Sequence, residues 1–88
     1  MKSNASYSIK IKASAAKSLW QIPRIEGIRI VEAIDRLARE PFAGGVLKGE
    51  FSGLRRLRIG RYRIVYEVSE GNLTVLVVRI GHRREVYR

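Results

Sequence analysis

Three strand-like runs follow one another closely in the second half of the chain, and this order restricts the fold more than any other feature. The runs cover residues 54–59, 62–68 and 73–80, and apolar side chains recur in each of them. The short connections at 60–61 and 69–72 contain the glycine, serine and asparagine residues that are typical of tight turns. Because tight turns join antiparallel neighbours, we expect a three-stranded antiparallel meander.

The first half of the chain adds one strand and two helices. Residues 7–11 alternate apolar and polar side chains, which is the period of a strand with one solvated face. Ser14 offers an N-cap for a short helix through Trp20, whose ring we expect to pack this helix against the sheet. Pro23 suits the start of a second helix, which we expect to continue to the residue before Pro41.

These elements predict a single domain of the α+β class over residues 1–88. An N-terminal strand would be followed by two helices that pack on one face of a small, mainly antiparallel sheet, and a glycine-rich connection over 44–53 would join the helices to the meander. The chain has no cysteine, and no apolar stretch reaches the roughly 18–20 residues of a membrane span. We therefore expect a cytoplasmic protein without a membrane partner.

The charge of the chain indicates an anionic partner. Lysine and arginine number 18 against 8 acidic residues, for a net charge of +10. The basic residues in the second half are all arginines except Lys48, and arginine binds phosphate through two parallel hydrogen bonds. A basic surface kept for solubility would account for lysines better than for clustered arginines. Nucleic acid is therefore the first partner to consider.

Strand alternation predicts where these arginines point. Arg56 and Arg58 share one face of their strand, and hairpin pairing brings Arg63 close to them on the same side. Strict alternation in the last strand groups Arg79 with Val75 and Val77, and Arg79 joins the cationic face if that group lies on it. Like charges that face each other across strands are unfavourable, so we expect an anion to bind there. The candidates for RNA or phosphate contact are Arg55, Arg56, Arg58, Arg61, Arg79 and Arg84.

The segment Gly81-His82-Arg83-Arg84-Glu85-Val86-Tyr87-Arg88 directly follows the last strand-like run. It holds three arginines, the only histidine and a near-terminal tyrosine, which is a composition suited to a phosphodiester. One histidine and scattered acidic residues do not have the spacing of metal ligands, so we expect no metal and no cofactor.

Residues 47–49, 54–68 and 78–87 resemble the RelE branch of the RelE/ParE toxin superfamily, through the patterns G-x-Y-R-x-x-Y and G-H-R-x-x-V-Y. The strand and helices of the first half extend this resemblance to nearly the whole chain. It implies the toxin of a type II toxin–antitoxin module, whose partners are the ribosome, messenger RNA and a cognate antitoxin that covers the basic surface. Such toxins cut the message in the ribosomal A site without metal, by turning the 2′-hydroxyl on the adjacent phosphate.

The resemblance and the chemistry of RNA cleavage together assign roles to five catalytic candidates. Arg63 would hold the phosphate, and Arg83, or Arg84 beside it, would hold the leaving-group side. Tyr87 would stack on a base or orient the 2′-hydroxyl. Family members often carry lysines on the second strand, where this chain has arginines, which are poor proton acceptors. We expect Lys48 or His82 to act as the base, and Glu50 is a further candidate.

Two other functions fit the same fold and charge. A toxin of the ParE branch would poison DNA gyrase without cutting RNA, although the arginines, His82 and Tyr87 agree better with the RelE branch. A non-catalytic RNA-binding module would explain the absence of an evident base.

Overall fold

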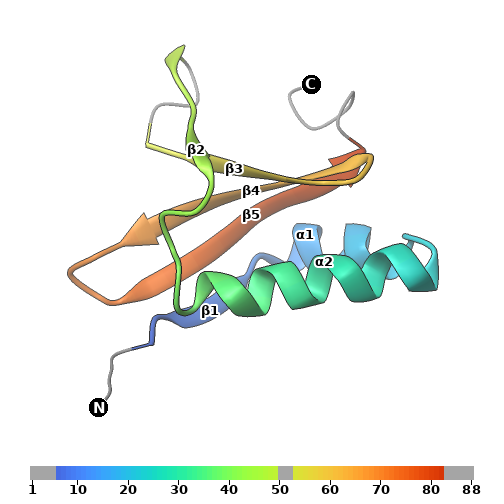
Figure 1. Ribbon diagram of the computed structural model, residues 1–88, viewed down its shortest axis with the longest axis horizontal. Helices are drawn as coiled ribbons and strands as arrows, with labels where there is room; N and C mark the ends of the chain where they lie inside the picture. Colours follow the sequence, from blue (N-terminus) through green and yellow to red (C-terminus); the bar gives the residue numbers. More distant parts are fainter. Residues whose placement is uncertain (1–5, 50–52, 83–88) are drawn as a thin grey trace.

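The computed structural model describes residues 6–49 and 53–82, which form two helices and one five-stranded sheet (Figure 1). The elements in chain order are β1 (Ser8–Ile11), α1 (Ala13–Trp20), α2 (Arg24–Leu37), β2 (Gly45–Val46), β3 (Arg55–Ile59), β4 (Tyr62–Ser69) and β5 (Thr74–His82). Neither helix is long and apolar enough to cross a membrane, within the described part of the chain.

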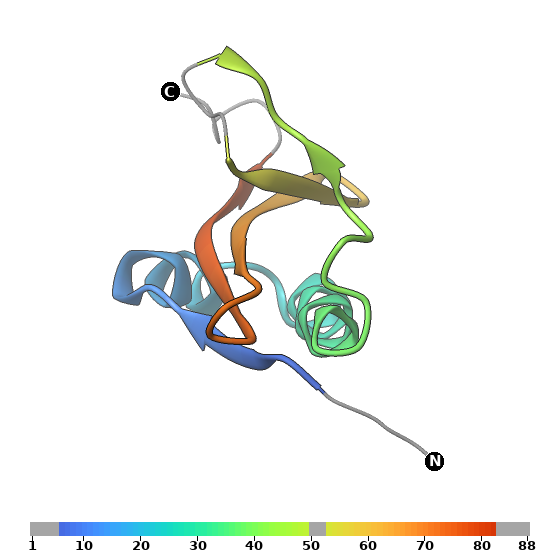
Figure 2. The same cartoon turned by 90° about the vertical axis from the view of Figure 1, so that its left-hand side faces the viewer.

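The sheet has the strand order β1-β5-β4-β3-β2, in which β2 to β5 are antiparallel and β1 runs parallel to β5. Both helices lie on one side of the sheet (Figure 2). The predicted meander and the predicted α+β class are confirmed. The short strand β2 was not predicted, because its two residues belong to the glycine-rich connection and carry no periodic signal.

The core lies between the helices and the sheet. In α2, Ile30, Ala33, Ile34 and Leu37 have the i, i+3, i+4, i+7 spacing of one helix face, and all four are buried. They join residues of α1 and of the three central strands in one apolar cluster. The buried members of this cluster are Ala15, Ile30, Ala33, Ile34, Leu37, Ile64, Tyr66, Val75, Val77 and Ile80. Burial of each large apolar side chain stabilises the fold by about 1.5–3 kcal/mol.

Three details of the helices differ from the predictions. Lys12, rather than Ser14, is the N-cap residue of α1, and no side chain caps this helix, because β1 runs almost directly into it. Helix α2 ends at Leu37, well before Pro41. Trp20 does not pack against the sheet and is 86% exposed, since Ala15 and Leu19 occupy the inward face of α1.

A β-bulge between β4 and β5 changes which residues of β5 face the helices. Val65 pairs with Arg79, whereas the next residue, Tyr66, pairs with Val77, so β5 has one extra residue at this point. The bulge shifts the alternation so that Val77 and Ile80 are both buried in the core. The expected grouping of Arg79 with Val75 and Val77 is therefore wrong, and Arg79 lies on the opposite face.

Candidate nucleic-acid interface on the open face of the sheet

Four arginines gather on the side of the sheet that the helices leave open. We call the surface formed by Arg56, Arg58, Arg63 and Arg79 the arginine face. Arg58 pairs with Arg63 across β3 and β4, while Val65 pairs with Arg56 on one side and with Arg79 on the other. Residues that pair directly across neighbouring strands have Cβ atoms roughly 4.5–5.5 Å apart, so the side chains of Arg58 and Arg63 start close together, while Arg56 and Arg79 lie on either side of Val65.

The arginine face carries far more positive than negative charge. Arg56, Arg58 and Arg79 are exposed, whereas Arg63 is half-buried and its Nε atom is inaccessible to solvent. Glu67, exposed on β4, is the single carboxylate that the alternation of the described strands places on this side. Four guanidinium groups and one carboxylate on the described part of this face create a positive potential that attracts polyanions.

An apolar cluster covers the centre of this face. Val65 is only 3% exposed because Leu47 and Leu54 pack against it, and the backbone N–H of Leu47 donates a 2.9 Å hydrogen bond to the carbonyl oxygen of Leu54. The chain after β2 therefore folds onto the side of the sheet away from the helices, as Figures 1 and 2 show. Lys48 directly follows Leu47 and is exposed, so it lies at the border of the arginine face.

Arg55 is separated from the other arginines of β3. It pairs with the core residue Tyr66, and its Nη1 atom donates hydrogen bonds to the carbonyl oxygens of Gly44, at 2.7 Å, and Phe42, at 3.4 Å. Its guanidinium also lies 4.9 Å from the centre of the Phe42 ring. These contacts attach the segment before β2 to β3, so the structure does not bring Arg55 together with the arginine face.

Tyr66, a core residue, also binds the segment before β2. Its hydroxyl oxygen accepts a 2.8 Å hydrogen bond from the backbone N–H of Gly44. Burial raises the pKa of Tyr66 above its usual value of 10.0, and the Gly44 hydrogen bond and the charge of Arg55 offset part of this rise. The neutral phenol is thus the form that the fold prefers.

His82 and Arg61 lie at the end of the sheet where β5 finishes. His82 pairs with Tyr62, and the two rings meet edge to face with their centres 6.0 Å apart. Arg61 is exposed in the β3–β4 turn, next to Tyr62, where Gly60 adopts a left-handed conformation (φ 58°). This end also carries the pair Arg58–Arg63, so Arg61 borders the arginine face, whereas His82 lies beside Tyr62, which packs against the core on the helix side.

The other candidate residues, Glu50, Arg83, Arg84 and Tyr87, lie outside the described residues. Arg83 follows His82 directly in the sequence. No group of three histidine, aspartate or glutamate side chains close enough to hold a metal ion occurs over residues 6–49 and 53–82.

Sequence reasoning missed the apolar cluster of Leu47, Leu54 and Val65. A signal was present, because Val65 is an apolar residue between Arg63 and Glu67 on a face that was expected to be polar. Such a residue indicates that another segment covers the face at this point.

The sequence matches known proteins over almost its full length. A family model described as the ParE toxin of type II toxin–antitoxin system, parDE, matches residues 9–87. The toxin RelG of Mycobacterium tuberculosis is 32% identical over 84 residues, which cover 93% of this chain and 97% of the relative.

Solved structures agree with this match. The toxin–antitoxin complex RelBE2 of Mycobacterium tuberculosis contains a chain that is similar with a TM-score of 0.83 and 30% identity, covering 89% of this chain and 99% of that chain. The archaeal RelE–RelB complex from Pyrococcus horikoshii gives a TM-score of 0.77 and 29% identity, covering 92% of this chain and 99% of that chain.

Proposed function

The chain belongs to the RelE/ParE superfamily of toxins from type II toxin–antitoxin systems, and on this premise we propose that it is a ribosome-dependent endoribonuclease. It would cut messenger RNA in the A site and so inhibit translation in the cytoplasm. The observation that carries the proposal is the arginine face, where Arg58 and Arg63 are direct cross-strand neighbours on the side of the sheet away from the helices.

Cleavage in this proposal uses the 2′-hydroxyl of the RNA as nucleophile. The 2′-oxygen loses its proton and attacks the adjacent phosphorus, and the bond from phosphorus to the 5′-oxygen breaks. The products are a 2′,3′-cyclic phosphate and a 5′-hydroxyl end that takes up a proton. Negative charge grows on the phosphate oxygens during the attack, so fixed positive donors at this point lower the barrier.

Arg63 is the best placed donor for that charge. Its guanidinium is half-buried on the central strand β4, so its position is held by its surroundings before RNA binds. Arg58, exposed beside it, can contact the same phosphate, while Arg56 and Arg79 contact the neighbouring ones. Removal of one such preorganised donor lowers the rate by about 10²–10³-fold in comparable sites.

The proton transfers are assigned to residues around this phosphate. We assign the base to Lys48, which follows Leu47 of the apolar cluster, or to His82, at the end of β5, and the leaving-group side to Arg83. Tyr87 would stack on a base or orient the 2′-hydroxyl. The roles of Arg83 and Tyr87 come from the G-H-R-x-x-V-Y pattern alone.

Primer extension on ribosome-bound messenger RNA tests the proposed function. The wild-type chain should produce cuts in the A-site codon, and Arg63→Ala should reduce them by about 10²-fold. Arg29→Ala is the matched control, because it removes the same charge from α2 on the other side of the sheet. Equal cutting by both variants would remove Arg63 from the site, and no cutting by the wild type would reject the nuclease.

The description of the matching family model favours a second candidate function. It names the ParE toxin, and a toxin of that branch would act on DNA gyrase. DNA damage in cells that express the chain, together with intact messenger RNA, would support this alternative. If neither damage nor cutting occurs, a non-catalytic RNA-binding protein is the remaining function.

A cognate antitoxin is the expected protein partner, since RelBE2 and the archaeal RelE–RelB structure are both toxin–antitoxin complexes. We propose that an acidic segment of the antitoxin covers the arginine face, and that an amphipathic helix of the same antitoxin docks between α1 and α2. A groove of about 440 Å³ lies there, and three of its large apolar lining residues remain exposed: Trp20 (86%), Ile28 (48%) and Val31 (43%). Exposed apolar patches of this kind mark protein interfaces, and acidic residues would complement the +10 charge of the chain.

A further inference from the structure

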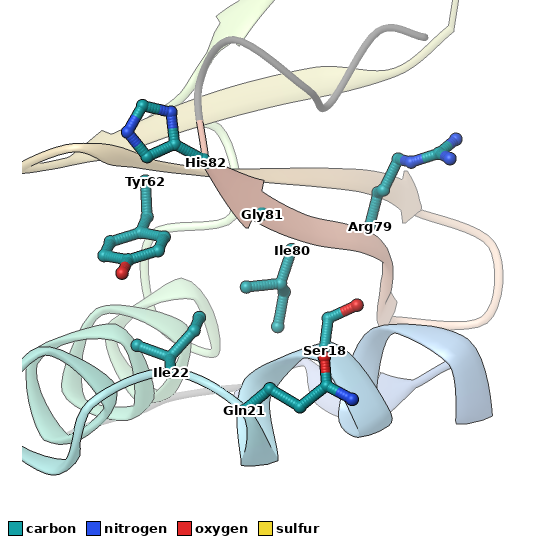
Figure 3. Close-up of a pocket in the computed structure, with 8 residues that line it drawn as sticks. All are labelled: Ser18, Gln21, Ile22, Tyr62, Arg79, Ile80, Gly81 and His82. Carbon is teal, nitrogen blue, oxygen red and sulfur yellow. The ribbon is translucent and has the colours of Figure 1, made fainter.

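A second cleft lies beside the end of β5, beyond the residues that pair with β1. The last residue of β1, Ile11, pairs with Val77, so the end of β5 has no neighbour from β1 and faces the C-terminal end of α1 instead. A cleft of about 450 Å³ opens at this place, and we call it the edge pocket. It is lined by Ser18, Gln21, Ile22, Tyr62, Arg79, Ile80, Gly81 and His82 (Figure 3).

The edge pocket combines flat aromatic and apolar walls with polar groups on one side. Figure 3 shows Tyr62 and His82 on one side and Ser18 and Gln21 on the other, with isoleucine side chains between them. The exposed Gln21 carboxamide carries both donors and an acceptor. The Ser18 hydroxyl donates a 3.2 Å hydrogen bond to the carbonyl oxygen of Ser14, so towards the pocket Ser18 offers lone pairs, which accept.

Arg79 connects the edge pocket to the arginine face. Its stem borders the pocket, while its guanidinium points away from α1, as Figure 3 shows. Val65, the cross-strand partner of Arg79, is in turn the partner of Arg56. A nucleotide whose phosphate is bound by Arg79 therefore has its base within reach of the pocket.

We propose that the edge pocket binds one adenine base of the RNA and so selects the sequence that is cut. A base has apolar faces, which match the aromatic and apolar walls of the pocket, and a polar edge, which matches Ser18 and Gln21. RNA-binding proteins recognise unpaired bases by stacking and edge hydrogen bonds of this kind. Adenine presents an amino donor beside a ring nitrogen acceptor, which a glutamine carboxamide can contact with two hydrogen bonds. Guanine would instead place its O6 acceptor against the accepting oxygen of Ser18. The inference rests on the proposed function, because it takes RNA as the ligand.

NMR titration of the free, full-length chain with single nucleotides tests this inference without the ribosome. AMP should shift the side-chain amide signals of Gln21 and the ring signals of Tyr62 and His82, more strongly than GMP, CMP or UMP at the same concentration. Ribose 5-phosphate, which lacks a base, should shift only signals of the arginine face. Equal binding of the four nucleotides, or shifts confined to the arginine face, would overturn the inference.

Two variants separate base selection from folding and from cleavage. Gln21→Leu keeps the size of the side chain and should weaken AMP binding by about tenfold, since a bidentate base contact contributes on the order of 1–3 kcal/mol. Gln21→Glu keeps the acceptor and loses the donors, so it should lose the preference for AMP over GMP. Gln21 is exposed at the C-cap of α1, so both variants should retain the wild-type amide spectrum elsewhere.

The ribosome assay then distinguishes failure of this inference from failure of the proposed function. If Gln21→Leu spreads its cuts over codons without adenine, base selection by the edge pocket is supported. If its cutting pattern is unchanged, the inference fails while the nuclease stands. If the wild type does not cut at all but AMP still binds Gln21, the nuclease fails and the nucleotide site stands.

Discussion

Arg58 and Arg63 face each other directly across the β3–β4 ladder, so two guanidinium groups project from neighbouring positions on the open face of the sheet. Like charges in this arrangement repel each other, and the pair therefore costs some stability. Such a cost is understandable if this surface binds phosphate, as proposed, and the pair therefore provides a direct test of the proposed site.

Replacement of Arg58 by threonine should stabilise the fold while it weakens RNA cleavage. Relief of the repulsion should raise the free energy of unfolding by roughly 0.2–1 kcal/mol. Arg56→Thr is the matched control on the same strand, because Arg56 pairs with the apolar Val65 and has no like charge opposite to lose. Urea denaturation of the two variants measures the difference, and equal stability changes would contradict the proposed repulsion.

RNA binding by the free protein should weaken steeply with salt. If the four residues of the arginine face each neutralise one phosphate, the slope of log affinity against log salt should be near −2.8 for single-stranded RNA, at about −0.7 per phosphate. Arg79→Ala should make the slope less steep by about 0.7, whereas Arg29→Ala on α2 should leave it unchanged. Fluorescence anisotropy with a short labelled RNA at several salt concentrations provides the measurement. A flat response in the wild type would exclude this face as the docking surface.

Gly44→Ala should detach β2 from the rest of the sheet. A Cβ atom at this position would collide with the carbonyl oxygen of Arg56 and lie 2.7 Å from the Tyr66 hydroxyl oxygen. Forced contacts of this kind cost about 1–3 kcal/mol, and the buried Gly44–Tyr66 hydrogen bond would be lost with them. At the neighbouring Gly45, an added Cβ meets no atom within 4 Å, so Gly45→Ala is the control. Hydrogen exchange of the Leu47 amide should become faster only in Gly44→Ala.

The fold should lose stability in alkaline solution partly through Tyr66. Burial raises its pKa in the folded state above the usual 10.0, so the unfolded chain releases the phenol proton first as the pH rises. The contribution of Tyr66 is therefore complete below about pH 10 and declines as the pH rises towards the higher folded pKa. Tyr66→Phe should be less stable than wild type at neutral pH and show a weaker decline as the pH rises above about 10. Urea denaturation at several pH values measures both effects. Tyr7→Phe, on the margin of the core, is the control for the general effect of alkali.

Trp20→Ser should weaken binding of the antitoxin without affecting the fold. The side chain is 86% exposed, so its loss removes little packing within this chain, whereas a central aromatic residue in an interface often contributes about 2 kcal/mol or more. Leu73→Ser is the control, because Leu73 is also an exposed apolar residue (44%) but lies in the β4–β5 turn. Isothermal titration with the cognate antitoxin measures both variants. Unchanged affinity of Trp20→Ser would show that the antitoxin does not use this groove.

Local patterns in the sequence were sufficient to predict the meander, the buried stripe of α2 and the shared face of Arg56, Arg58 and Arg63. Each of these features repeats with the period of a single helix or strand, or follows from a tight hairpin such as Gly60-Arg61. Side-chain direction within such elements depends on residues close in the sequence, so sequence periodicity determines it.

Contacts between distant segments decided the rest. The bulge opposite Val65 placed Arg79 on the arginine face, against strict alternation, because the packing of both Val77 and Ile80 in the core requires one extra residue in β5. The cover of Val65 by Leu47, and the edge pocket between α1 and β5, likewise bring together residues that are far apart along the chain. No local period encodes such contacts, since they depend on strand register and on how the helices lie against the sheet, and only the tertiary structure settles those.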